Sequence, residues 1–494
     1  MSEAHRQILR ATSIIGGSSL VNVAVGLVRN KIAALILGPA GIGLVGIFHN
    51  LMQTGAALAA FGIGNVGTRQ LAEAGDDEHA RVVARRALGI AAGVLAVTGG
   101  VLLFLARRPV AELVLGREDW ADTVGWLAAG MALLVGTVAQ NGLLTGLRRV
   151  GDLARVSILS AILGTLAGVA ALLVWRERAL LAFVLVSPLA TFLVGAYFVR
   201  RLPRASAPRP PLRELVPQWR TLARLGLAFT VGSLVGTAGQ LTVRSLVGRQ
   251  LGAESLGQFQ AAWTISMNYI GFILMAMAAD YYPRLTAAMR DRAEAARTVN
   301  HQAEVALLLA GPVLVGTVAF APWIVQLLYS PEFMPAAALL RWQIAGDLLK
   351  IAGWPLGFIL LAAGRGHAFM LTEALGAAVL VAVTASMLPR TGLIAPGVAY
   401  VTTYLVYLAV TFLLARRLIG YAPSPAAVQA MLVVGLALLG TAAMTLVHPV
   451  AGAVVGFAAA LGLAWFAAVR LHHALPEPLA ALLAFVPGVG RVRP

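Results

Sequence analysis

Long apolar runs, separated by short polar segments, follow one another along the whole chain. Each run has about 20 residues or more, and a helix of that length crosses the hydrocarbon core of a bilayer at about 1.5 Å per residue. A membrane β-barrel would instead show alternating segments of about 10 residues, so strands are not expected. We predict fourteen membrane-spanning helices near residues 9–37, 41–68, 83–106, 121–146, 154–175, 179–199, 221–249, 255–283, 301–328, 334–363, 367–388, 392–415, 426–447 and 451–471.

One internal similarity divides this series of spans. Residues 19–43 align with residues 233–257 at an offset of 214, and eight positions are identical: Ser19, Leu20, Val21, Ala24, Leu27, Leu37, Gly38 and Gly43. The match places the first two spans on the seventh and eighth. Because six spans is an even number, both copies start on the same side of the membrane, which predicts parallel lobes related by an axis along the membrane normal.

The longest polar stretch, residues 200–220, lies between the two copies and is rich in proline and arginine. This composition favours an extended cytoplasmic linker. We therefore predict an N-terminal lobe in 1–200, a linker in 201–220, a C-terminal lobe in 221–418, and two additional spans with a cytoplasmic tail in 419–494. The expected fold class is an all-α polytopic membrane protein with two pseudo-symmetric parallel lobes around a central cationic cavity.

Composition supports this class and orients the chain. Of the 494 residues, 59% are hydrophobic and 12% are charged, whereas soluble domains carry about 25% charged residues. The net charge is +17. In a membrane protein such a basic excess indicates topology, because basic residues collect in cytoplasmic loops. We therefore expect no nucleic-acid partner. With the N-terminus in the cytoplasm, 26 Lys and Arg fall on the cytoplasmic side, 7 on the other side and 5 inside spans. Both termini are thus expected to be cytoplasmic.

Several chemistries are not indicated by the sequence. Cysteine is absent, which excludes disulfides, thiolate metal sites and a cysteine nucleophile. The chain has no P-loop, no HExxH motif and no nucleophile elbow. We therefore expect neither an enzyme nor a cofactor or metal site, and transport would draw on an ion gradient or on the substrate's own concentration difference.

Charged residues inside spans are the main candidates for function, because a charge at the bilayer centre costs at least about 2.5–3.5 kcal/mol. In the run 333–361, Gln343, Asp347 and Lys350 recur at i, i+4 and i+7, which places them on one face of a helix. Asp347 and Lys350 can pair. Two readings stay open: a functional pair facing the lumen, or a neutral clamp between helices. Arg341 lies on the opposite face, nearer the start of the helix, and we expect it at the membrane interface.

Two arginines occupy related positions in the two copies. Arg29 lies in the first span, and Arg244 in the seventh lies one residue from the repeat counterpart of Arg29. Together they predict a cationic central cavity. Lys31 points about 200° away from Arg29 on the helix, and it is expected to pair or to extend toward the membrane interface. Glu373, inside the eleventh span, is a candidate proton or cation site, or else a structural hydrogen-bond partner.

Five segments, taken together and in order, resemble one family of transporters. Residues 27–44 hold an arginine in the first span, then Leu-Gly-Pro and Gly-x-Gly; residues 332–350 hold Glu-Phe followed by Trp-Gln-x-x-Gly-Asp-x-x-Lys. Residues 281–285, 369–375 and 399–417 continue the similarity. The chain resembles Wzx-type polysaccharide flippases, in particular the enterobacterial-common-antigen lipid III flippase branch of the multidrug/oligosaccharidyl-lipid/polysaccharide exporter superfamily.

The resemblance covers about residues 5 to 418, and the two last predicted spans depart from that branch. It implies a flippase that moves an undecaprenyl-pyrophosphate-linked oligosaccharide from the cytoplasmic to the periplasmic leaflet of a bacterial inner membrane, for O-antigen or enterobacterial common antigen. Arg29, Arg244 and Lys350 would bind the pyrophosphate, and Asp347, Gln343 and Glu373 would line the lumen or couple transport to protons or sodium. The implied partners are the lipid-linked oligosaccharide, the bilayer, and a glycan polymerase with its chain-length machinery.

Four alternatives remain at this point. A multidrug or cation antiporter and a peptidoglycan lipid II flippase belong to the same superfamily, but an antiporter for cations favours an acidic cavity, against three basic candidates here. A membrane-embedded glycan polymerase or ligase needs a sizeable periplasmic loop, and the largest predicted one spans only residues 107–120. The fourth alternative is a scaffold without transport.

Overall fold

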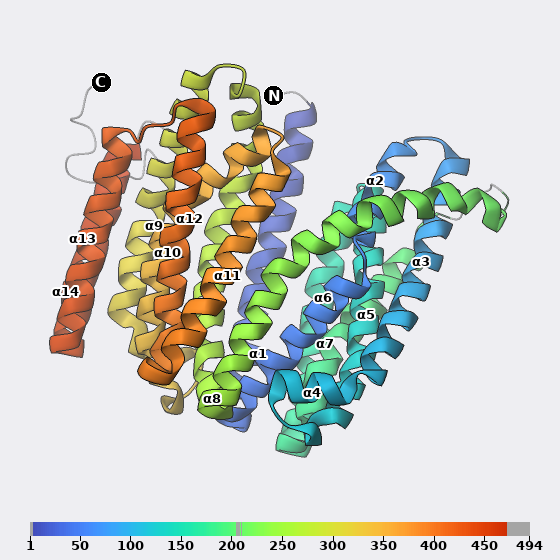
Figure 1. Ribbon diagram of the computed structural model, residues 1–494, viewed down its shortest axis with the longest axis horizontal. Coiled ribbons are helices and arrows are strands. Elements are labelled where there is room, and N and C mark those ends of the chain that lie inside the picture. The colour runs from blue at the N-terminus through green and yellow to red at the C-terminus, as the bar shows by residue number, and fades with distance from the viewer. Residues whose placement is uncertain (1–2, 204–207, 209, 472–494) are drawn as a thin grey trace. The chain divides into compact units, whose positions relative to one another are not determined.

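The protein is helical throughout the part described by the computed structural model, residues 3–203, 208 and 210–471 (Figure 1). Within these ranges there is no β-strand. The α-helices are α1 (Glu3–Ala59), α2 (Ile63–Glu73), α3 (Glu78–Leu105), α4 (Arg107–Leu115), α5 (Ala121–Gly146), α6 (Val150–Trp175), α7 (Leu180–Arg200), α8 (Leu212–Ala288), α9 (Arg292–Leu328), α10 (Ala336–Ala362), α11 (Gly366–Thr391), α12 (Ala395–Ile419), α13 (Pro425–Val447) and α14 (Pro449–Leu471).

The predicted spans coincide with these helices. Nine helical segments of the described chain are long and apolar enough to cross a membrane, and a bent segment of α8 makes a tenth. Three of the nine, Gly16–Ala59, Val150–Arg200 and Gly366–Ile419, each contain two of the predicted spans. Helices satisfy every backbone polar group within the segment, which a bilayer requires. The prediction of an all-α polytopic membrane protein is confirmed.

The chain divides into two compact units. The first unit comprises Met1–Gln260 with Leu328–Glu332, and the second unit comprises Ala261–Leu327 with Phe333–Pro494. Helix α8 contributes to both units. The predicted division at residues 201–220 and the pseudo-symmetric arrangement of lobes around a central cavity stay predictions.

Two glycines break the long helices at corresponding places. Gly38 in α1 has φ 61° and ψ −172°, and Gly252 in α8 has φ 87° and ψ 172°. Positive φ angles favour glycine because it lacks a Cβ atom. The two positions are 214 residues apart, which is the offset of the internal similarity in the sequence. Each glycine separates two predicted spans, so the helix is interrupted at the same place in both copies. We call each of these two interruptions, at Gly38 and at Gly252, a corner.

A second pair of equivalent glycines brings the two corners together inside the first unit. A Cβ atom on Gly43 would lie 2.5 Å from the carbonyl oxygen of Ala253, and one on Gly257 would lie 1.7 Å from the carbonyl oxygen of Pro39. Side chains larger than hydrogen therefore cannot occupy these positions while the backbones remain in contact. The close approach explains why glycine stands at both of them.

The core of the first unit forms where α2, α3, α5 and α7 pack together. Buried side chains there include Ile63, Leu88, Met131, Leu143 and Phe198. The small residues that dominate these helices allow close helix packing, as is usual in membranes.

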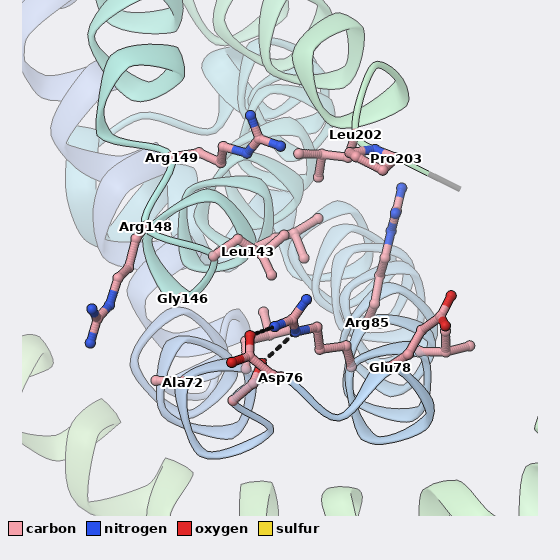
Figure 2. A pocket seen from close by; sticks show the side chains of 15 residues that line it. Ala72, Asp76, Glu78, Arg85, Leu143, Gly146, Arg148, Arg149, Leu202 and Pro203 are labelled. Carbon is pink, nitrogen blue, oxygen red and sulfur yellow. Dashed lines mark hydrogen bonds and ion pairs between the residues drawn. The ribbon is translucent and has the colours of Figure 1, made fainter. Parts of the chain in front are cut away.

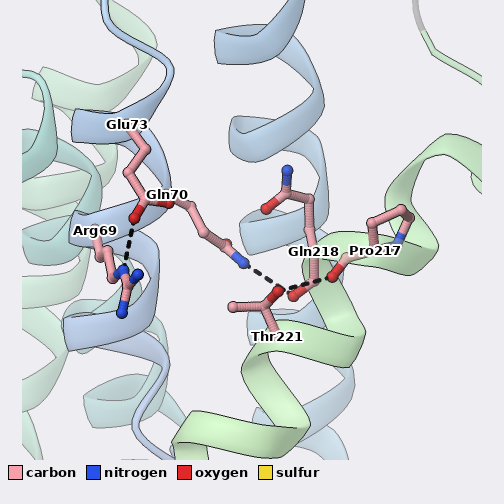
Figure 3. Close-up of polar contacts among 6 residues, drawn as sticks. All are labelled: Arg69, Gln70, Glu73, Pro217, Gln218 and Thr221. Atoms are coloured by element: carbon pink, nitrogen blue, oxygen red, sulfur yellow. Dashed lines mark hydrogen bonds and ion pairs between the residues drawn. The ribbon is translucent and has the colours of Figure 1, made fainter.

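The predicted extended linker is helical from Leu212 onward, so the expectation of an extended chain is wrong for residues 212–220. Figure 3 shows Gln70 of α2 donating from Nε2 to the carbonyl oxygen of Gln218 at 2.9 Å. The indole nitrogen of Trp219 donates to the carbonyl oxygen of Ala87 in α3 at 3.1 Å. The segment packs against apolar surface of α2 and α3, and this contact favours a helix over the extended form that the prolines and arginines predicted.

In the second unit, α10 and α12 pack closely because glycines face tyrosines. A Cβ atom on Gly346 would lie 2.3 Å from the ring of Tyr400, and one on Gly357 would lie 2.4 Å from the hydroxyl of Tyr407. The two final helices attach to the same unit: Arg470 of α14 lies 3.6 Å from the Glu304 carboxylate of α9. The pairing of glycine with tyrosine determines where the hydroxyl groups of α12 lie along α10.

We predict that Gly257→Ala lowers the thermal stability of the detergent-solubilised protein. The added methyl group overlaps the Pro39 carbonyl, and overpacking of this kind costs about 1–3 kcal/mol or more. The melting temperature measured by fluorescence-detected size exclusion should fall by several degrees. The matched control is Gly236→Ala in the same helix, where the added Cβ meets nothing within 4 Å. Equal melting temperatures for both variants would contradict the close contact of the two corners.

Candidate functional site

Asp347 lies fully buried near the middle of α10 and is surrounded by hydroxyl groups. Ser266 Oγ donates to Oδ2 at 2.7 Å, Tyr269 donates to the same oxygen, and the Tyr400 hydroxyl donates to Oδ1 at 2.8 Å. Hydrogen bonds to an ionised acceptor are roughly twice as strong as neutral ones. Three hydrogen-bond donors from two other helices thus offset part of the free-energy cost of burying the Asp347 carboxylate.

Lys350 joins this group through Tyr400. Its Nζ donates to the Tyr400 hydroxyl at 3.5 Å and lies 5.3 Å from the centroid of the Tyr404 ring. The Tyr400 hydroxyl accepts from Lys350 and donates to Asp347, so the three groups form a continuous hydrogen-bonded chain. We call Ser266, Tyr269, Asp347, Lys350, Tyr400 and Tyr404 the Asp347 cluster.

The predicted pairing of Asp347 with Lys350 is therefore indirect. Although residues at i and i+3 are neighbours on a helix, these two described side chains form no direct ion pair within 4.0 Å. The reason lies on the facing helix: Gly346 leaves room for the Tyr400 ring, and the tyrosine hydroxyl enters between the acid and the base. The spacing of Asp347 and Lys350 along the sequence gives no indication of Tyr400.

Gln343, one turn before Asp347 on the predicted polar face, is 1% exposed. Among the described residues, neither its amide nitrogen nor its amide oxygen has a hydrogen-bond partner. A buried polar group without a partner costs about 1–3 kcal/mol. The structure thus keeps a buried amide without a hydrogen-bond partner among the described residues of α10 and its neighbours.

The remaining acidic candidate, Glu373, lies on α11 with its side chain exposed, next to Tyr407 and within electrostatic range of Lys350. Arg341 is half-buried, and its Nε has no hydrogen-bond partner among the described residues. The described residues contain no group of three His, Cys, Asp or Glu side chains able to hold a metal ion.

Arg29 is fixed to α7 inside the first unit. One guanidinium nitrogen donates to Ser187 Oγ and the other to the carbonyl oxygen of Phe183 at 2.9 Å. The guanidinium also stacks 4.3 Å from the centroid of the Phe183 ring. All three contacts are with neutral groups, so the positive charge of Arg29 is positioned without being neutralised by them. Lys31 donates to the carbonyl oxygen of Tyr329.

Arg244 is 4% exposed and also lies in the first unit. Its Nε donates to Gln260 Oε1 at 3.0 Å, and Nη1 donates to the carbonyl oxygen of Gln240 at 3.2 Å. Both Arg29 and Arg244 act electrostatically on His49 of α1. Both predicted arginines lie in the first unit, whereas Lys350 belongs to the second.

Four members of the Asp347 cluster were missed by sequence reasoning: Ser266, Tyr269, Tyr400 and Tyr404. A signal for part of it exists, because Tyr400, Tyr404 and Tyr407 recur at i, i+4 and i+7 in an otherwise apolar helix. Hydroxyl groups at this spacing form one face. Ser266 and Tyr269, which lie on α8, have no such signal.

Comparisons with known proteins agree with this architecture. The family described as "Polysaccharide biosynthesis protein" matches residues 8–289. The Lipid III flippase of Escherichia coli (strain K12) is 26% identical over 431 residues, which cover 83% of this chain and 99% of the relative; the Lipid III flippase of Shigella flexneri gives the same values.

Solved structures with this fold are transporters. The lipid II flippase MurJ in an inward closed conformation aligns with a TM-score of 0.70 at 10% identity, covering 94% of this chain and 99% of that one. An inward-facing MATE family multidrug resistance transporter of the MOP superfamily aligns with a TM-score of 0.67 at 19% identity, covering 81% and 98%. The chain therefore shares its fold with these two membrane proteins. The chain belongs to the polysaccharide biosynthesis protein family, since that family matches more than half of its length, and the predicted family resemblance is confirmed.

We predict that Gln343→Leu raises the free energy of unfolding by about 1 kcal/mol, because it removes a buried amide that has no partner. Thermal unfolding in detergent measures the change. The matched control is Gln70→Leu: Gln70 is equally a buried glutamine, but its amide donates to Gln218, so this variant should lose stability. A Gln343→Leu variant as destabilised as Gln70→Leu would show that the Gln343 amide is partnered in the folded protein.

Proposed function

We propose that this protein is a flippase that translocates an undecaprenyl-pyrophosphate-linked oligosaccharide from the cytoplasmic to the periplasmic leaflet of a bacterial inner membrane. The observation that carries the proposal is the similarity to Lipid III flippases over 99% of their length. Membership of the polysaccharide biosynthesis family and the transporter fold support transport rather than catalysis. The glycan serves cell-surface polysaccharide, either O-antigen or enterobacterial common antigen. Both termini lie in the cytoplasm, as the distribution of basic residues predicts.

The arginines of the first unit suit the charged part of such a substrate. A pyrophosphate is a multiply charged anion, and arginine binds phosphate through a planar, bidentate group. The hydrogen bonds of Arg29 to Phe183 and of Arg244 to Gln240 and Gln260 are made to neutral oxygen atoms, so binding an anion would exchange them for charge-assisted hydrogen bonds. We assign the pyrophosphate to these residues, with Lys350 as a further candidate. Cooperation with a glycan polymerase and its chain-length machinery remains a prediction.

The Asp347 cluster suits the coupling of transport to an ion gradient. When Lys350 is drawn toward an anion, the chain through Tyr400 loses its positive end, and the buried carboxylate of Asp347 loses the charge that favours its ionised form. Proton uptake by Asp347 would follow. Gln343 and Glu373 then provide polar groups near the same helix face. A buried carboxylate also suits a cation antiporter, and this is the observation that favours the second candidate, a multidrug or cation antiporter of the same fold.

The function is tested by complementation of a bacterial strain that lacks its lipid III flippase. We expect expression of this protein to restore surface polysaccharide and to remove the accumulated lipid-linked precursor, measured by gel staining and lipid mass spectrometry. Export of cationic dyes without restored polysaccharide would favour the antiporter instead.

In the same strain, Arg244→Ala and Arg29→Ala should abolish restoration at normal protein levels, while the lysine variants should restore part of it because a point charge replaces the bidentate group. Arg178→Ala, at an exposed arginine of the first unit, is the matched control.

We predict that Tyr400→Phe uncouples transport from the proton gradient. The substitution keeps the ring in the space left by Gly346 but removes the hydroxyl that links Lys350 to Asp347. Flipping in reconstituted vesicles, measured with and without a proton gradient, should lose its gradient response. Tyr282→Phe, at an exposed tyrosine of the same unit, should respond like the unmodified protein. A normal response in both Tyr400→Phe and Asp347→Asn would leave the cluster a structural role.

A further inference from the structure

A cavity of about 760 Å³ lies at one end of the first unit, where α2 and α3, α5 and α6, and the end of α7 come together. Four arginines line it: Arg81, Arg85, Arg148 and Arg149. Figure 2 shows Arg85 and Arg149 extending toward Leu202 and Pro203, while Arg148 extends away from them. These arginines are distinct from Arg29 and Arg244, and the proposed translocation mechanism does not use them.

Most of this positive charge is not neutralised by protein groups. Arg81 is occupied, since it contacts Asp76 at 2.6 Å and the carbonyl oxygen of Gly75 at 2.5 Å. Arg85 has one hydrogen bond, to the neutral carbonyl oxygen of Val199 at 3.3 Å. Within the described chain, no acidic side chain pairs with Arg85, Arg148 or Arg149. The lining acids, Asp76 and Glu78, are two against four arginines, so the cavity carries a net positive charge.

The cavity continues into an apolar groove of about 640 Å³ between α3, α5 and α7. Arg85 and Leu143 line both spaces, so the groove starts where the cationic cavity ends. Small residues form most of the groove wall: Gly89, Ala92, Gly93, Ala96, Ala129, Ala132, Gly136 and Ala139.

The groove is open toward the bilayer side of α3. A Cβ atom added to Gly89 or Gly93 would meet nothing within 4 Å, so no side chain fills the space beside them. In an 18-residue apolar stretch of α3, only 11% of the residues are buried inside the protein, which places this helix at the lipid-facing surface. Val94, Val97 and Val101 are exposed on the same helix. An apolar chain that enters from the bilayer can therefore occupy the groove.

We propose that this cavity and groove together bind an anionic phospholipid of the bilayer, with its phosphate at Arg85 and Arg149 and one acyl chain in the groove of α3, α5 and α7. Arginine recognises the phosphate oxygens through paired N–H donors, and basic pockets between membrane helices commonly hold anionic lipid headgroups. A soluble phosphate would leave the apolar groove unused, and a zwitterionic lipid would gain less from the positive cavity. The bound lipid connects the α2–α3 and α5–α6 corners of the first unit.

Native mass spectrometry of the purified full-length protein tests the proposal, with phosphatidylglycerol as the probe and phosphatidylethanolamine as the zwitterionic comparison. We expect phosphatidylglycerol to bind at least tenfold more tightly. Arg149→Gln should weaken its binding severalfold, and Arg85→Gln with Arg149→Gln by tenfold or more. Arg149 is exposed and its side chain makes no hydrogen bond within the described chain, so the single variant keeps the fold. Arg176→Gln, at an exposed arginine elsewhere in the first unit, should bind like the unmodified protein.

The groove is tested separately by Gly93→Leu, which fills the open space and should weaken phosphatidylglycerol binding severalfold without lowering the melting temperature. Its control is Gly236→Leu, where the surroundings are also open. Unchanged binding in Gly93→Leu would overturn the proposal. So would full displacement of the lipid by millimolar inorganic phosphate, which would make the site one for soluble anions, or preferential displacement by undecaprenyl phosphate, which would make it a site for the transported lipid.

Discussion

The buried carboxylate of Asp347 is the constraint around which the second unit is arranged. A charge inside a membrane protein is tolerated only with partners, and here the partners come from α8 and α12. Ser266, Tyr269 and Tyr400 can reach one side chain only if both α8 and α12 pack against the middle of α10. The glycine at 346 makes this convergence possible, because it admits the Tyr400 ring against the helix backbone. Polar chemistry and close packing are thus parts of the same arrangement.

Hydropathy was sufficient for the fold because each span is a local feature. The apolar runs placed the helices, and the internal similarity aligned Gly38 with Gly252, two glycines that both have positive φ angles in the structure. The linker prediction failed from Leu212 onward, because composition describes an isolated segment, whereas Gln218 and Trp219 are bound by α2 and α3. Likewise, the spacing of Asp347 and Lys350 predicts one helix face, but the residue that links them comes from 50 positions beyond Lys350 in the chain. Contacts of that kind leave no local pattern.

The two final helices illustrate how the comparisons add to the sequence. The Lipid III flippases match 83% of this chain, whereas the MurJ structure covers 94% of it. The larger coverage fits a fold that includes α13 and α14. These two helices correspond to the last two predicted spans, which depart from the lipid III branch. Arg470 of α14 lies beside Glu304 of α9, and the same arginine contacts Gln429 of α13. One basic residue thereby attaches both additional helices to the second unit, so they are integrated parts of its structure.

The charges of the two units differ in a way that agrees with the proposed division of labour. The first unit holds Arg29 and Arg244, two cations whose hydrogen bonds with Ser187, Phe183, Gln240 and Gln260 are made to neutral groups. The second unit holds Asp347 and Lys350, an acid and a base linked by one tyrosine, so the charges of these two side chains offset each other. The positive charges of the two arginines suit the binding of an anionic headgroup. The Asp347–Tyr400–Lys350 chain suits coupling instead, because withdrawing Lys350 changes the environment of the Asp347 carboxylate. An anion bound near the base would therefore change the state of the acid, and for this reason we propose binding at the arginines and coupling at the Asp347 cluster.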